Sequence, residues 1–327
     1  MKSWRKIFGE CLRMIILLFA VSVIAFLLII KSPIDPLVSY VGTNTTISEE
    51  AKQEIAKEWD LDAPPMQRFI TWGEHALKGD LGMSITYKKP VSEVIKTRFS
   101  YSILLMAISW LLSGILGFIL GVMCGIIDGS IFDRVVKTFC LILKSAPVFW
   151  IGLIVVSIFS VKLHWFPIGM AVPAGKMASD VTIADKIHHL ILPAFTLTIV
   201  SISEVVLYTR QKVIDVMNSD FVLYARTRGE NTKQLITRHI LRNVSLPAIT
   251  VQFSSFSELF GGMALAETVF SYPGIGMAIT AAALNSDVPL LLGISIFSAI
   301  FVFTGNLIAN ILYGVFDPRI REGDTRG

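Results

Sequence analysis

Charged side chains are the residues of this sequence best suited to chemistry, and several gather in one stretch. Between Asp220 and Pro247 the sequence reads DFVLYARTRGENTKQLITRHILRNVSLP. Its five basic residues are Arg226, Arg228, Lys233, Arg238 and Arg242. No nucleophile-base set accompanies them, and the chain contains neither HExxH nor GxSxG. This argues against a metalloprotease or a common serine hydrolase, so we predict no catalytic residues.

Cofactor and metal motifs fail on their spacing. The nearest match to a phosphate-binding GxxxxGK[ST] loop is GMAVPAGK, from Gly169 to Lys176, with one residue too many between its glycines and Met177 in place of Ser or Thr. His188 and His189 are adjacent, whereas helical metal sites use an i,i+4 pair. We therefore predict no bound cofactor and no metal site, and we expect the histidines to anchor the start of a helix at the membrane interface.

Three cysteines offer no redox pattern. Cys11, Cys124 and Cys140 lie in or beside apolar segments and form no CxxC pair. Small apolar packing is the expected role of such cysteines.

Polar residues inside apolar segments are better functional candidates. Glu258 lies within a long apolar stretch, where an ionisable group is costly unless it faces a polar cavity or a partner. Asn306 and Asn310 stand at i,i+4 on one helix face. We predict that these three residues line the translocation pathway. For Glu258, a structural ion pair is an equally good alternative. For the two asparagines, hydrogen bonding between packed helices is the favoured explanation. We expect Glu204, near the cytoplasmic end of its span, to reach water, and it is therefore a weaker candidate for the pathway.

Membrane helices must position these residues. The chain has 327 residues, 53% of them apolar and 17% charged, with a mean hydropathy of +0.65. A membrane span needs about 20 mainly apolar residues. Six segments qualify: 12–30, 101–127, 135–161, 190–207, 246–270 and 289–316. The predicted fold class is an all-α integral membrane protein with six transmembrane helices, the first a retained anchor rather than a signal peptide.

The distribution of Lys and Arg predicts the orientation. Seven lie in the loop 208–245, and none lies between residues 268 and 289. Because short loops rich in Lys and Arg stay in the cytoplasm, we expect the basic loop and both termini to be cytoplasmic.

The predicted organisation follows from these spans. Residues 1–31 are the cytoplasmic N-terminus and first span, 32–100 an extracytoplasmic loop with a small helical part, 101–316 a five-helix core containing the loop 208–245, and 317–327 a cytoplasmic tail. Within the second span Gly117, Gly121 and Gly125 recur every fourth residue, which predicts close packing against another helix, with a hinge as the alternative.

The basic stretch has an amphipathic character. Phe221, Leu223 and Tyr224 with Ala225 predict a short helix that ends near Gly229. Such a helix can lay its apolar side into a groove of a soluble partner. Composition alone favours the alternative of a solvated loop that obeys the positive-inside rule.

The order of these residues resembles a known family. The stretch is similar to the cytoplasmic loop of permease subunits of binding-protein-dependent ABC importers, in the dipeptide, oligopeptide and nickel branch. The matching residues are Asp220, Phe221, Val222, Ala225, Arg226, Arg228, Gly229, His239, Arg242, Asn243, Leu246 and Pro247. Further phrases match in order: SPIDP, LDAPPMQRFITW, GDLGMS, APVFWIGL, ETVFSYPGIG and DPRIR. Leu223 and Tyr224 depart from the Glu-Ala of ABC importers at large.

This resemblance implies a transport subunit of the ABC importer permease fold, which is not an enzyme. All the matching loop residues except Val222 and Leu246 are then expected to couple the chain to an ATPase. The implied partners are a second permease, two cytoplasmic ATPase subunits that bind ATP and magnesium, an extracytoplasmic binding protein and the lipid bilayer of a bacterial or archaeal cytoplasmic membrane, with no nucleic acid.

Two other classes of protein remain open. A secondary carrier would depend on a coupling ion, and an intramembrane enzyme would need a nucleophile-base set. The cargo also stays open between peptides and nickel or metal chelates. RHILRNVSLP and SELFGG resemble nickel or metal-chelate permeases slightly more than peptide permeases.

Overall fold

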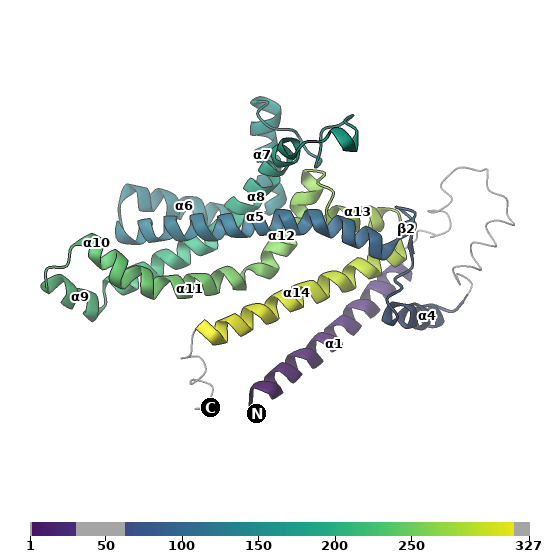
Figure 1. Ribbon diagram of the computed structural model, residues 1–327, viewed down its shortest axis with the longest axis horizontal. Coiled ribbons are helices and arrows are strands. Elements are labelled where there is room, and N and C mark those ends of the chain that lie inside the picture. The colour runs from purple at the N-terminus through teal and green to yellow at the C-terminus, as the bar shows by residue number, and fades with distance from the viewer. Residues whose placement is uncertain (1, 31–62, 317–327) are drawn as a thin grey trace. The chain divides into compact units, whose positions relative to one another are not determined.

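The computed structural model describes residues 2–30 and 63–316, and within them the elements of regular structure are helices apart from one short hairpin (Figure 1). The chain divides into two compact units. The first contains Met1–Ser102 and Pro273–Phe303, and the second contains Ile103–Tyr272 and Thr304–Gly327. Helices α5 (Val91–Ile126) and α14 (Val288–Phe316) contribute residues to both units.

The first unit contains helices and the hairpin. Its other elements are α1 (Lys2–Ile30), α4 (Pro65–Leu77), β1 (Met83–Ser84), β2 (Lys89–Pro90) and α13 (Ile275–Leu284). α4 begins at Pro65, where the fixed φ of proline suits the first turn of a helix. The two strands pair antiparallel, Met83 with Pro90 and Ser84 with Lys89. This hairpin was not predicted, because a helical part was the only regular structure expected within the loop 32–100.

A buried carboxylate fixes the hairpin to the start of α14. Asp287 is fully buried, and its Oδ2 accepts hydrogen bonds from Ser84 Oγ at 2.6 Å and from the backbone N–H of Thr86 at 2.8 Å. Its Oδ1 accepts from the N–H of Leu290 at 3.2 Å. Because a buried carboxylate is costly unless its oxygens are bonded, these contacts fix the position of the hairpin.

The apolar core of the first unit joins α5, α13 and α14. Val91, Ile95, Ile275 and Leu290 are buried in one cluster. Gly293 lies so close to this cluster that an added Cβ would stand 2.6 Å from Val91 Cγ1. The start of α5 is therefore packed against α14 along a glycine.

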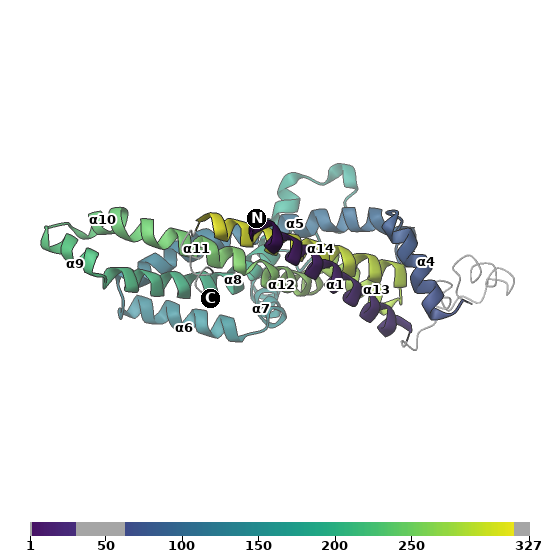
Figure 2. The same ribbon diagram turned by 90° about the horizontal axis from the view of Figure 1, so that it is seen from below.

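The second unit contains the remaining helices. They are α6 (Ile131–Ser145), α7 (Val148–Val155), the π-helix η1 (Val156–Lys162), the 3-10 turn η2 (Ala178–Asp180), α8 (Ile183–Met217), α9 (Asp220–Thr227), α10 (Thr232–Leu235), the π-helix η3 (Ile236–Ile240), α11 (Leu241–Ser254) and α12 (Phe256–Val269). α6 and α11 both pack on α8, and the three run side by side in Figures 1 and 2.

The glycine stripe of α5 lies against α8, as its spacing predicted. A Cβ added at Gly121 would stand 2.6 Å from Thr209 Cβ and 2.9 Å from the carbonyl oxygen of Val206. At Gly125 it would stand 2.5 Å from Val213 Cβ. These distances are shorter than any ordinary contact, so the two helices approach as closely as their backbones allow.

Three described helices are long and apolar enough to cross a membrane: Val91–Ile126, Ile183–Met217 and Val288–Ala309. They contain most of the second, fourth and sixth predicted spans. The first predicted span lies in α1, where the apolar stretch among the described side chains is Leu12–Ile24. Large apolar side chains are exposed along α5, among them Leu111, Ile115 and Ile119, as expected of a helix in lipid.

The predicted span 135–161 is not one straight helix. α6 and the pair α7–η1 meet at a bend of 113°. Ala146 is extended at φ −95° and ψ 136°, because the ring of the following Pro147 disfavours a helical residue before it. If the bent pair counts as one span, the described residues contain four.

The predicted span 246–270 is also divided. α11 ends at Ser254 and α12 begins at Phe256, so neither helix alone has the length of a span. Glu258, predicted halfway along one helix, lies instead in the first turn of α12. The small helical part predicted within the loop 32–100 was expected to begin after Ser48, which lies outside the described residues.

Candidate functional site

Helix α9 forms the start of the basic stretch, and its end is defined by backbone hydrogen bonds. Gly229 has φ +83°, its N–H donates to the carbonyl of Arg226 at 2.9 Å, and the N–H of Glu230 donates to the carbonyl of Ala225 at 3.2 Å. This pair of bonds is a Schellman motif, which favours glycine because of the left-handed backbone. The prediction that the short helix ends near Gly229 is confirmed.

The two sides of α9 differ in what they contact. Val222 and Ala225 are buried and pack against Leu235 and Val216 of the same chain. The rest of the helix surface exposes Phe221, Leu223 and Tyr224, and the exposed fraction of Tyr224 is 65%. Ala225, one of the residues expected to couple the chain to an ATPase, is buried by its contacts with Leu235 and Val216 and does not belong to the exposed part of the helix. We call Phe221, Leu223 and Tyr224 the exposed apolar face of α9.

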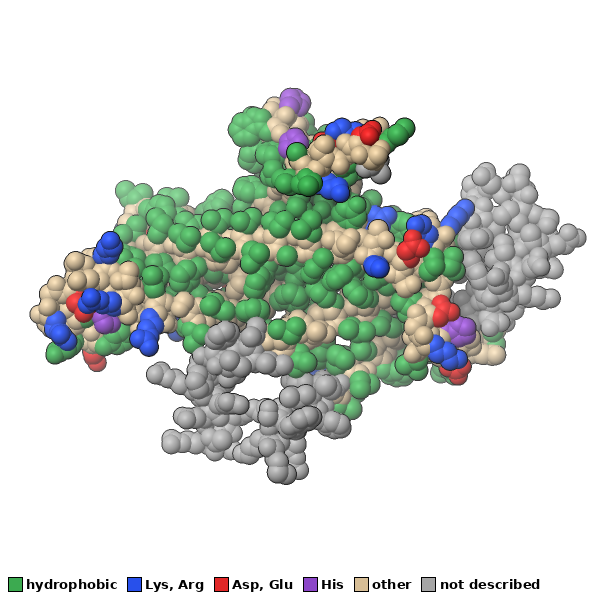
Figure 3. All heavy atoms as spheres, in the orientation of Figure 1, with side chains coloured by type: hydrophobic (Ala, Val, Ile, Leu, Met, Phe, Trp, Pro, Cys, Tyr) green, Lys and Arg blue, Asp and Glu red, His purple; other side chains and the backbone are tan. Residues whose placement is uncertain are grey.

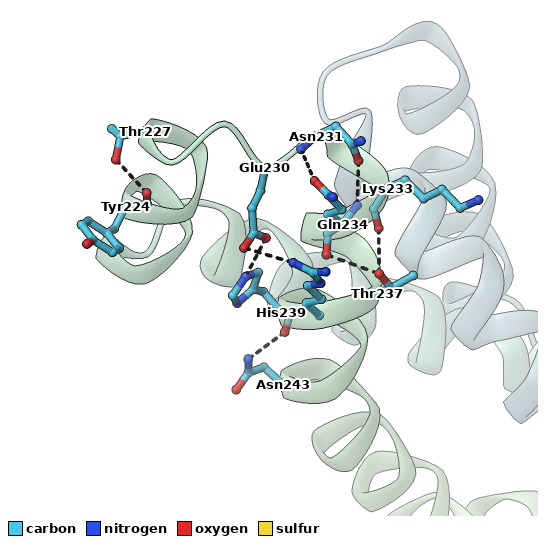
Figure 4. Close-up of polar contacts among 10 residues, drawn as sticks. Tyr224, Thr227, Glu230, Asn231, Lys233, Gln234, Thr237, His239 and Asn243 are labelled. Carbon is cyan, nitrogen blue, oxygen red and sulfur yellow. Dashed lines mark hydrogen bonds and ion pairs between the residues drawn. The ribbon is translucent and has the colours of Figure 1, made fainter.

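Glu230, which no sequence motif indicated, links α9 to the next helix. Glu230 Oε2 lies 3.0 Å from His239 Nε2, and Oε1 lies 3.7 Å from Arg238 Nη1. Figure 4 shows the side chains of Glu230 and His239 pointing toward each other. The pair is nine residues apart along the chain, and no helical spacing joins such residues, so no sequence pattern indicated it.

The segment after Glu230 is held by local bonds. Asn231 and Gln234 form a capping box at the start of α10, with both bonds at 2.9 Å. η3 follows and leads into α11, where Asn243 Nδ2 donates to the carbonyl of His239 at 2.7 Å. Pro247 lies inside α11. The predicted residues His239, Asn243 and Pro247 therefore belong to one continuous helical path from η3 into α11.

The remaining predicted loop residues are exposed. Asp220, Arg226, Arg228 and Arg242 are all open to solvent. Figure 3 shows charged side chains gathered at the end of the second unit formed by α9 and α10, while green apolar side chains cover the helices beside it. This end offers an apolar face surrounded by charge.

Glu258 lines a pocket of about 160 Å³ within the second unit. The pocket lies at the bend between α6 and α7, against α8 and the first turns of α12. Its charged side chains are Lys144, Glu204 and Glu258. Glu204, to which the sequence gave less weight, thus shares a cavity with Glu258.

Asn306 of α14 does not line that pocket. Asn306 Oδ1 accepts a hydrogen bond from Ser257 Oγ at 2.7 Å, which joins α14 to α12. This is the interhelical bond that the sequence favoured for Asn306. Asn310 lies in α14, and its side chain is outside the described residues.

The paired histidines bind a backbone loop. His188 Nε2 lies 3.0 Å from the carbonyl oxygen of Trp165, and His189 Nδ1 lies 2.9 Å from that of Gly169. A carbonyl only accepts, so each ring nitrogen donates. The described residues contain no group of three or more His, Cys, Asp or Glu side chains that could hold a metal ion.

Three described helices, or four spans if the bent pair counts as one, are long and apolar enough to cross a membrane, which is typical of a multi-pass membrane protein. The family model for "Binding-protein-dependent transport system inner membrane component" matches residues 117–322, and the chain belongs to this family. Permease subunits of this family are not themselves catalytic.

Curated relatives match nearly the whole chain. The oligopeptide transport system permease protein AppB of Bacillus subtilis is 33% identical over 93% of this chain and 95% of its own length. The di/tripeptide transport system permease protein DppB of Pseudomonas aeruginosa is 31% identical over 93% and 95%. These names describe peptide permeases and lend no support to the slight preference for nickel.

Proposed function

We propose that this chain is one of two permease subunits in an ATP-driven importer of short peptides, and that α9 is the helix on which a cytoplasmic ATPase subunit docks. The peptide assignment rests on the named activities of the relatives. An extracytoplasmic binding protein delivers the peptide, and the ATPase subunits bind ATP and magnesium.

The exposed apolar face of α9 is the observation that supports docking best. Phe221 and Leu223 are 47% and 49% exposed, and together with Tyr224 they stand on a helix whose other side is fixed in the chain. Exposed aromatic residues on a rigid support are typical of helices that bind a groove on a partner. Co-purification of the cognate ATPase with the permease pair tests the proposal directly.

We propose the topology that apolar segments and the distribution of Lys and Arg predict: six spans, with the loop 208–245 and both termini in the cytoplasm. The test places single cysteines at Glu74, exposed on α4, and at Thr232, exposed on α10, in a chain whose own three cysteines are replaced by serine. We expect an impermeant maleimide added outside intact cells to label position 74 and to spare position 232. Labelling of position 232 alone contradicts the topology.

We propose that Glu258 borders the translocation pathway. It shares its pocket with Glu204 and Lys144 at a bend between helices, where these charged side chains can meet a polar cargo. The substitution Glu258→Gln keeps the shape and removes the charge, so we expect several-fold slower peptide uptake with normal amounts of assembled complex. The matched control is Glu93→Gln, on an exposed turn of α5 in the first unit. Parent-level uptake by Glu258→Gln would assign this residue a structural role.

A further inference from the structure

The contacts of Glu230 bring two helical segments together. Its backbone N–H closes the Schellman motif of α9, while its carboxylate reaches His239 on η3 at 3.0 Å. A carboxylate only accepts hydrogen bonds, so His239 Nε2 is the donor. One residue thus completes the end of α9 and binds that end to the following helix.

His239 also contacts the other end of α9. The ring centroids of Phe221 and His239 are 6.1 Å apart, with an interplanar angle of 46°. Phe221 belongs to the first turn of α9, and Glu230 follows its last turn. His239 is therefore a common support for both ends of the helix.

The path continues from His239 into the membrane helix. The carbonyl oxygen of His239 accepts the hydrogen bond from Asn243 of α11, and η3 runs directly into α11. η3 is a π-helix, a local widening that often occurs at functional positions. A displacement of α9 at His239 would therefore pass into α11 through covalent and hydrogen-bonded contacts.

The two contacts of Glu230, with His239 and with Arg238, differ in how far their side chains are exposed to water. The side chains of Glu230 and His239 are 19% and 27% exposed, whereas that of Arg238 is 62% exposed. A contact that is partly shielded from water is screened less than one on the surface. The Glu230–His239 contact, rather than the Arg238 contact, is then the one that holds the two segments together.

Capping alone does not explain the carboxylate. The end of α9 is satisfied by the backbone N–H groups of Gly229 and Glu230, for which any side chain at position 230 would serve. The carboxylate instead turns toward η3 (Figure 4). Its role therefore concerns the position of α9 relative to η3.

We propose that Glu230 and His239 form a positioning clamp, which keeps α9 in fixed register with η3 and α11 so that movement of the docked ATPase reaches the membrane helices. This inference rests on the proposed function of α9. The clamp transmits motion, whereas the exposed apolar face provides docking.

The test uses the complete importer, with both permeases, the ATPase subunits and the binding protein, in proteoliposomes. Glu230→Leu and His239→Leu each remove the contact and keep a side chain of moderate size. We expect the number of peptides imported per ATP hydrolysed to fall about tenfold in each variant. This is within the range of effects measured for substitutions at residues that link two distant sites. The amount of ATPase bound should stay at the parent level.

Three further variants complete the experiment. His239→Gln retains a nitrogen donor close to Nε2 and should restore most of the coupling. The double variant should be no worse than either single one, because residues that act as a unit are not additive. Lys233→Ala is the matched control, since Lys233 is exposed on α10 and its side chain points away from Glu230 (Figure 4).

The outcomes distinguish the clamp from docking. Parent-level import per ATP in Glu230→Leu and His239→Leu, with the ATPase bound, overturns the clamp and leaves the proposed function standing. Loss of the ATPase from these variants also overturns it, because the residues would then belong to the docking surface. If the detergent-solubilised variants unfold at the same temperature as the parent protein, misfolding is excluded as the cause of a reduced import per ATP.

Discussion

Replacing Tyr224 by aspartate is expected to release the ATPase subunits and abolish peptide uptake. Tyr224 is 65% exposed at the centre of the apolar face of α9, and no described contact holds its ring inside the chain. A charge placed in a desolvated groove destabilises the complex strongly, and aromatic anchors typically contribute about 2 kcal/mol or more, which is about 30-fold in affinity. The measurement is the ratio of ATPase to permease after affinity purification from membranes.

Two variants control this experiment. Tyr224→Phe keeps the apolar ring and should retain the ATPase. Met177→Asp introduces the same charge at another exposed apolar residue, in the loop between η1 and α8, and should leave the complex intact. Normal co-purification and uptake with Tyr224→Asp would show that α9 does not dock the ATPase and is only a solvated helix in a loop rich in positive charge.

Enlarging Gly121 of α5 is expected to prevent stable packing of the second unit. The Cβ of Gly121→Leu would meet Thr209 Cβ at 2.6 Å and a backbone oxygen at 2.9 Å, and backbone cannot turn aside as a side chain can. Overpacking typically costs about 1–3 kcal/mol, and a backbone clash on an α5–α8 contact belongs at the upper end. We expect low amounts of protein in the membrane and an aggregated profile in size-exclusion chromatography.

The control for that variant is another helical glycine. Gly261 lies in α12, and an added Cβ there would meet no atom within 4 Å. Gly261→Leu should therefore accumulate and elute like the parent protein. If Gly121→Leu does the same, α5 and α8 are not held by close backbone contact.

The parts of this structure that the sequence predicted correctly depend on short-range rules. The end of α9 follows from one glycine with φ +83°, and the α5–α8 contact follows from a four-residue repeat of glycine. Both signals are local, so periodicity and turn chemistry suffice to find them. The bend at Pro147 also has a local cause, although the apolar run through it favoured a single span.

The parts that were missed depend on tertiary contacts. Ala225 turns inward because Leu235 and Val216 stand on that side of α9, which no property of residues 220–229 reveals. Glu230 meets His239 across an intervening helix and turn. The break at Ser255 has neither proline nor glycine beside it, so Glu258 was placed in the middle of a helix rather than at the start of one.

The central claim is that this permease moves peptides with energy from a separate ATPase. The most direct test is peptide uptake into proteoliposomes that contain the two permeases and the ATPase subunits, with loaded binding protein added on the outside and ATP enclosed. We predict uptake that requires ATP hydrolysis and the binding protein and that Tyr224→Asp abolishes. Uptake by the permeases alone, driven by a proton or sodium gradient and insensitive to Tyr224→Asp, would contradict the claim and identify a secondary carrier.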